Sequence, residues 1–83
     1  MNNEDLCFTP AVELLDELRR GALSSVEITT AVLARIEKLE PRLNCFVTLM
    51  ADEALASARA ADAARAKGSD QPLLGVPVTI KDL

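Results

Sequence analysis

The sequence has no histidine, tryptophan or tyrosine, and only two phenylalanines, two cysteines and three glycines among its 83 residues. Without histidine, the chain cannot form a Cys-His nucleophile pair or an ordinary zinc site. Its two cysteines, Cys7 and Cys45, are too few for the disulfide framework of a small secreted domain. We therefore expect a reducing, cytoplasmic setting, with no metal and no cofactor.

An excess of positive charge and long apolar runs are also missing. Nine Lys and Arg residues stand against thirteen Asp and Glu residues, a net charge of −4, whereas binding to a phosphate backbone needs clustered basic side chains. No apolar stretch approaches the roughly 18 residues of a membrane span. The polar, acidic residues 1–5 are the reverse of a signal peptide. We expect this segment to bind neither nucleic acid nor membrane.

Alanine is the residue that the chain does have in quantity. Hydrophobic residues make up 49% of the sequence, but thirteen of them are alanine and few have large side chains. A chain of 83 residues can form one small domain or a piece of one. Its core is expected to be thin.

A first helix is predicted over residues 10–20. Thr9 is a favoured N-cap residue, and Pro10 suits the first helical position. Asp16 and Arg20 are spaced for an i,i+4 ion pair. The apolar side chains fall on one stripe, made of Val12, Leu14, Leu15 and Leu18.

A second helix is predicted over residues 25–39. Ser24 and Glu27 match the capping box S-x-x-E, in which each side chain accepts from the backbone N–H of the other residue. Pro41 is expected to end the helix. The apolar stripe consists of Ile28, Val32, Ile36 and Leu39, widened by Val26 and Leu33.

A third helix is predicted over residues 51–67, which hold nine alanines and precede Gly68. Its packing face is narrow and gives little stabilisation alone; it comprises Ala51, Ala54, Leu55, Ala58 and Ala61. Strands are predicted over residues 43–50 and 77–81 because both are rich in strand-forming residues. A buried strand that runs straight to the chain end is left without cover, so we expect a truncated N-terminal piece of a larger protein.

Lys81 is the one candidate for a chemical role. Alternate side chains of a strand share a face, so Lys81 would point with Thr79 and away from Asp82. A lysine carried into an interior by an apolar strand loses hydration, which favours its neutral form and makes it a candidate base. The alternative interpretation is a solvated charge at the end of a strand.

Residues 75–83, GVPVTIKDL, resemble the G-[VI]-P-[VI]-x-[IV]-K-[DN] segment of the amidase signature family. Further passages are similar, in order, to the N-terminal region of that family: residues 23–27, 34–36 and 41–47 and the alanine-rich helix before Gly68. The resemblance implies an α/β fold, with N-terminal helices and the first strands of a mixed β-sheet. It also implies a Ser, cis-Ser, Lys triad in which Lys81 is the base. In the family this lysine deprotonates the cis-Ser, and an amide is cleaved through an acyl-enzyme.

The resemblance places both catalytic serines beyond residue 83, because no serine of this chain matches the Gly- and Ser-rich signature; the four are Ser24, Ser25, Ser57 and Ser69. We expect the 83-residue chain alone to be inactive and its parent to hydrolyse a small-molecule amide. The family includes free-standing amidases and the subunit that releases ammonia from glutamine for amidation of mischarged tRNA. Leu83 favours the free-standing amidases, since the tRNA-linked group more often has Asn there.

A second hypothesis is a self-contained helical interaction module without catalysis. The first two helices would form a hairpin that docks a partner through Leu15, Leu18, Ile28, Val32 and Ile36. A DNA-binding helix-turn-helix is disfavoured because the second helix begins without a basic cluster. If the chain is instead a truncated piece, its uncovered strand favours self-association through Leu74, Val76, Val78 and Ile80.

Overall fold

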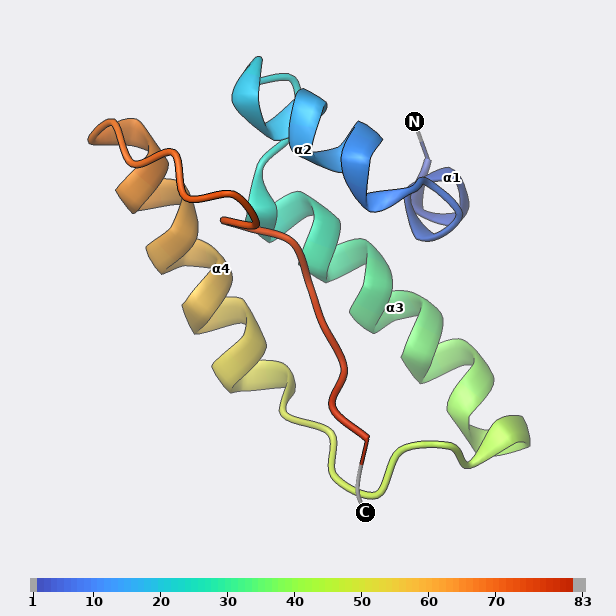
Figure 1. The fold of residues 1–83 in the computed structure, drawn as a ribbon. Helices are drawn as coiled ribbons and strands as arrows, with labels where there is room; N and C mark the ends of the chain where they lie inside the picture. The colour runs from blue at the N-terminus through green and yellow to red at the C-terminus, as the bar shows by residue number, and fades with distance from the viewer. Residues whose placement is uncertain (1, 82–83) are drawn as a thin grey trace.

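The computed structural model describes residues 2–81 as a bundle of four α-helices, with no strand in that range (Figure 1). The helices are α1 (Asn3–Cys7), α2 (Ala11–Arg19), α3 (Ser25–Leu43) and α4 (Ala51–Ala66). The longest helix, α3, packs against both α1 and α4. After α4 the chain turns back and runs alongside α3 and α4 (Figure 1). The expectation of a mostly helical chain is confirmed, and no helix within residues 2–81 has the length and apolar character to cross a bilayer.

Helix α2 confirms the first predicted helix to within one residue at each end, but two details differ. The N-cap is Pro10 rather than Thr9; the Thr9 hydroxyl donates to the Asp5 carbonyl at 2.6 Å. Arg20 pairs with Glu17 rather than with Asp16, because residues three apart on a helix are neighbours as much as residues four apart.

Helix α3 begins as predicted and ends later. The capping box is present, with the Glu27 N–H donating to Ser24 Oγ and the Ser24 N–H donating to the Glu27 carboxylate, both at 3.0 Å. The predicted end at residue 39 is wrong, because the helix continues through Pro41 to Leu43. Proline disfavours the helical conformation before it without forbidding it. The helix stops where Asn44 adopts a left-handed conformation at φ 49° and donates its N–H to the Glu40 carbonyl at 2.7 Å.

Helix α4 confirms the third predicted helix and its packing face. It ends at Ala66, one residue earlier than predicted. Ala58 is buried, and the other four residues of that face are half-buried: Ala51, Ala54, Leu55 and Ala61. Helix α4 contacts α3, and its packing face consists mostly of small side chains.

The core lies where α1, α2 and the first half of α3 meet. It consists of Leu6, Leu14, Leu15, Leu18, Ile28 and Ala31, with Leu23 and Val76 packed against it. Val12, assigned to the same stripe by the sequence, is instead 72% exposed. Because Leu15, Leu18 and Ile28 are buried in this core, they cannot form the docking surface of the interaction-module hypothesis.

The two predicted strands are not seen among the described residues. Residues 44–50 link α3 to α4 without regular structure, and residues 77–81 are likewise irregular. Their apolar side chains are largely exposed, with Val47 at 84%, Val78 at 76% and Ile80 at 91%. A strand exists only where a neighbouring strand accepts its backbone hydrogen bonds, and residues 2–81 supply no such neighbour.

Candidate functional site

Lys81, the sequence-predicted base, is the last described residue, and its side chain is exposed. Two backbone hydrogen bonds shape the chain leading to it: the Leu74 N–H donates to the Gln71 carbonyl and the Val76 N–H to the Leu73 carbonyl, both at 3.1 Å. Val76 is half-buried, whereas residues 78–81 are exposed. Lys81 is therefore not carried into the interior as the strand prediction required, because there is no strand to carry it. Its role as a base stays a prediction.

Gly75, the first residue of the motif, occupies a position that strongly favours glycine. Its φ is +91°, in the left-handed region that L side chains rarely adopt. A Cβ at this position would lie 3.2 Å from Leu18 Cδ1 and 3.3 Å from Ser25 Cβ. The backbone conformation therefore favours glycine, and a side chain here would in addition displace Leu18 or Ser25 by a few tenths of an ångström.

Two helices hold the turn at Leu74 and Gly75, called here the Leu74-Gly75 turn. The Leu74 carbonyl accepts from Arg65 Nη2 of α4 at 2.7 Å. The next carbonyl, of Gly75, accepts from Ser25 Oγ of α3 at 2.8 Å. Ser25 is 2% exposed, so its hydroxyl is a buried anchor for the motif and not only a residue of a helix start.

Asp62 of α4 binds the beginning of α3. Its Oδ1 accepts from the Ser25 N–H at 2.7 Å, and its Oδ2 accepts from the Val26 N–H at 3.1 Å. Together with the capping box of Ser24 and Glu27, this satisfies the four amides that a helix start otherwise leaves unpaired. The carboxylate also lies at the positive end of the helix dipole.

Sequence analysis missed Asp62 and Arg65. A signal was present, because Asp62 is four residues after Ala58 and so lies on the packing face of an alanine-rich helix. A carboxylate on such a face needs a buried hydrogen-bond partner. The sequence could not indicate that the partner is the start of α3, 36 to 37 residues earlier.

A second carboxylate organises the opposite end of α3. The Glu40 side chain accepts from the N–H groups of Phe46 and Cys45, both at 2.8 Å, and from the Cys45 thiol at 3.3 Å. These backbone donors, that of Phe46 first, lower the pKa of the Glu40 carboxyl. The hydrogen bond to Glu40 raises the pKa of the Cys45 thiol. Glu40 thus fixes the start of the linker between α3 and α4.

We expect Glu40→Gln to speed the alkylation of Cys45 by iodoacetamide several-fold at pH 8, because the thiol loses the carboxylate that disfavours its thiolate form. The rates are measured by mass spectrometry of each cysteine peptide, with Cys7 as internal reference and Glu37→Gln, on the same helix, as control. An unchanged rate at Cys45 would show that the Glu40 contact does not form in solution.

The same contact sets a dependence on pH. Because the pKa of Glu40 is lowered in the folded chain, its stabilising contribution is present above the ordinary value of about 4.3 and is lost as the pH falls through the lowered value. The amide resonances of Phe46 and Cys45 should therefore move in acid with a midpoint below about pH 4.3.

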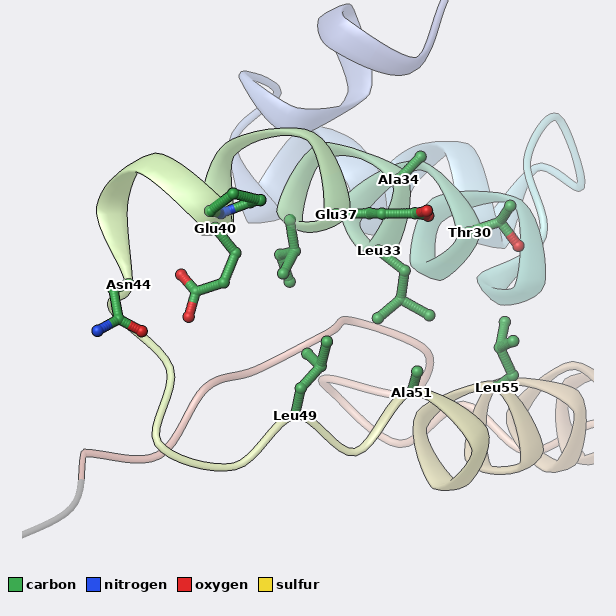
Figure 2. A pocket seen from close by; sticks show the side chains of 11 residues that line it. Thr30, Leu33, Ala34, Glu37, Glu40, Asn44, Leu49, Ala51 and Leu55 are labelled. Carbon is green, nitrogen blue, oxygen red and sulfur yellow. The ribbon is translucent and has the colours of Figure 1, made fainter.

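Beside this carboxylate, a pocket of about 670 Å³ lies between α3, the linker and the start of α4 (Figure 2). Leu33 on α3 faces Leu49 and Leu55 across it, while Glu37 and Glu40 supply its acidic groups (Figure 2). The pocket's described lining includes no residue of the 73–81 segment. Its described lining residues come from α3, the linker and α4.

Comparison with known proteins decides the family. The family model described as Amidase matches residues 27–83, more than half of the chain and the whole motif. The chain belongs to the amidase family. The resemblance drawn from the motif and the upstream passages is thereby confirmed.

Several curated relatives of this amidase-family chain carry one name, that of the A subunit of glutamyl-tRNA(Gln) amidotransferase. The protein of Geobacter metallireducens is 52% identical over 71 residues, which cover 86% of this chain and 15% of that protein. The protein of Methylococcus capsulatus is 54% identical with the same coverage. That of Azotobacter vinelandii is 57% identical over 73 residues, covering 83% of this chain and 15% of that protein. This chain thus spans about 15% of the length of the relatives it matches, and no solved structure matches it.

Proposed function

We propose that these residues are the N-terminal segment of a single larger amidase domain, within the A subunit of a glutamyl-tRNA(Gln) amidotransferase, with Lys81 as its catalytic base. The observation that carries the proposal is the identity of 52% to 57% with relatives of that name over more than four fifths of this chain. Leu83, outside the described residues, favours a free-standing amidase, but one residue weighs less than that identity. The mixed sheet of an α/β domain would then include residues 77–81 as a strand.

In the proposed reaction, Lys81 accepts a proton from the cis-Ser as the nucleophilic Ser, deprotonated by the cis-Ser, attacks the amide carbon of glutamine. The C–N bond breaks, the relayed proton passes to the leaving nitrogen, and ammonia departs from an acyl-enzyme that water then hydrolyses. The exposed position of Lys81 here would become desolvated under the remainder of the domain, which favours the neutral form that a base needs. The reaction uses no cofactor.

A chimera tests this function. Residues of the Azotobacter vinelandii protein that match this chain are replaced by it, and ammonia release from glutamine is measured in the complete amidotransferase. We expect a rate within about tenfold of the natural enzyme, because an exchange at 57% identity should displace the active site only slightly and larger displacements would cost more. We expect no ammonia release by the 83-residue chain alone. A second chimera exchanges only residues 73–83 and keeps the natural helices. If the first chimera is inactive and the second is active, poor folding of the first is the cause. A folded second chimera without activity would refute the proposal.

The isolated chain is also expected to self-associate. Val78 and Ile80 are exposed on the segment proposed to enter a sheet, and exposed apolar side chains on an unpaired segment seek other chains. Sedimentation at several concentrations should show a dimer or larger species. Val78→Lys should shift it toward monomer, whereas Val12→Lys, similarly exposed on α2, should not. A monomer at all concentrations would contradict this expectation.

A further inference from the structure

The last turns of α4 reach two distant parts of the chain at once. Asp62 and Arg65 are three residues apart and therefore lie on one face of the helix. Asp62 holds the first two amides of α3, and Arg65 holds the Leu74 carbonyl. Both residues are half-buried. One face of α4 thus sets the position of the α3 start and of the Leu74-Gly75 turn together.

Ser25 closes this arrangement into a ring. Its backbone N–H donates to Asp62, while its hydroxyl donates to the Gly75 carbonyl. A displacement of α3 relative to α4 therefore moves the anchor of Gly75. The turn also lies close to α2 and α3, since a Cβ on Gly75 would come within 3.2 Å of Leu18 Cδ1 and 3.3 Å of Ser25 Cβ.

Within the part of the chain that the structure describes, the ring and Val76, which follows it and packs against the core, are the last anchored points before Lys81. Val76 is the last residue there whose N–H donates to another backbone group. Lys81 is the sixth residue after Gly75, a reach of about 20 Å when fully extended. A general base must lie within about 3 Å of the proton that it accepts, so a small error at Gly75 is carried to the lysine.

We propose that Asp62 and Arg65 are positioning residues for Lys81, acting through Ser25 and the Leu74-Gly75 turn. This inference rests on the proposed function, because it takes Lys81 as the base. It assigns to α4 a role in catalysis, although no residue of α4 touches the reacting atoms in the proposed mechanism. Asp62→Asn leaves one α3 amide facing an amide nitrogen instead of an oxygen, and Arg65→Gln shortens the side chain that holds the Leu74 carbonyl.

The test measures glutamine hydrolysis in the chimera that exchanges the whole chain, at a temperature well below its Tm. We expect Asp62→Asn and Arg65→Gln each to lower kcat at least tenfold with KM within twofold. Arg65→Lys, which still presents a long N–H donor, should restore most of the rate. Matched controls on the exposed side of α4 are Asp52→Asn, which also removes a carboxylate near a helix start, and Arg59→Gln; both should keep kcat within twofold.

A double-mutant cycle separates positioning from a merely structural role. If Asp62 acts through Lys81, Asp62→Asn should cause no further loss once Lys81 is alanine, because the group being positioned is gone. Equal losses in both backgrounds would overturn the proposal. If Asp62→Asn unfolds the chimera, Ser25→Ala is used in its place, because it removes only the hydroxyl that donates to the Gly75 carbonyl. Its control is Ser57→Ala, at an exposed serine.

The outcomes distinguish the two proposals. If Lys81→Ala keeps full activity, the proposed function fails, and this inference fails with it. If Lys81→Ala abolishes activity but the variants of Asp62, Arg65 and Ser25 match their controls, this inference alone is wrong. In the 83-residue chain, NMR order parameters at Gly75 and Val76 should fall below about 0.6 in Asp62→Asn and stay near 0.85 in Asp52→Asn; rigid values in both would also overturn it.

Discussion

Replacing Lys81 by alanine in the active chimera is expected to lower kcat for glutamine hydrolysis by about 10² to 10⁴, the typical contribution of a general base. The fold should be unaffected, because the turn that anchors this segment lies six residues earlier and is held by Ser25 and Arg65, without the Lys81 side chain. Ammonia release reports the activity, and circular dichroism reports the fold.

Two further variants make this result specific to proton transfer. Lys81→Arg keeps the positive charge and a long side chain, but a guanidinium does not give up its proton in proteins, so it should be nearly as inactive as alanine. Lys67→Ala changes an exposed lysine just after α4 and should leave kcat unchanged. Substantial activity of Lys81→Arg would mean that the site needs a charge rather than a base.

Ile28→Ala should have the largest effect on stability. Ile28 is 0% exposed at the centre of the core, and removing such a side chain costs about 2 to 5 kcal/mol of the free energy of unfolding. A domain of this length has about 4 to 12 kcal/mol in all. At about 4 to 8 °C for each kcal/mol, the Tm should fall by more than about 8 °C in a thermal melt followed by circular dichroism.

The chain supplies a matched control of the same residue type. Ile80 is 91% exposed, so Ile80→Ala should change the free energy of unfolding by less than about 0.5 kcal/mol. Both melts are run at low protein concentration, where self-association through Ile80 contributes least. Equal losses at the two positions would place Ile28 outside the core.

Local signals predicted α2, α3 and α4 well, because caps and helix propensity depend on residues that are neighbours in the sequence. The capping box of Ser24 and Glu27 fixed the start of α3, and the alanine content of residues 51–67 fixed α4. Helix α1 was missed, since in its five residues Leu6 is the only large apolar side chain. The end of α3 was misplaced because Pro41 disfavours a helix without forbidding it, and the actual end, at the left-handed Asn44, depends on contacts that the sequence does not display.

The strands and the site depend on distant residues, and there the sequence was less informative. Residues 77–81 have strand propensity, but propensity is not realised without a partner strand. The motif pointed to Lys81 and the family, whereas its anchors on Asp62, Arg65 and Ser25 are contacts across 9 to 50 residues. Such contacts leave no periodic pattern in a single sequence.

The bond from Ser25 to Gly75 joins residues 50 apart, which has a consequence for biosynthesis. At about 5 to 20 residues per second, a ribosome adds Gly75 some 2.5 to 10 s after Ser25. Helices form in about a microsecond, so α2 and the start of α3 can be helical long before the motif exists. The motif is therefore synthesised after the residues of α2 and α3 on which it docks, and the segment that leads to Lys81 is the last described part of the chain to be made.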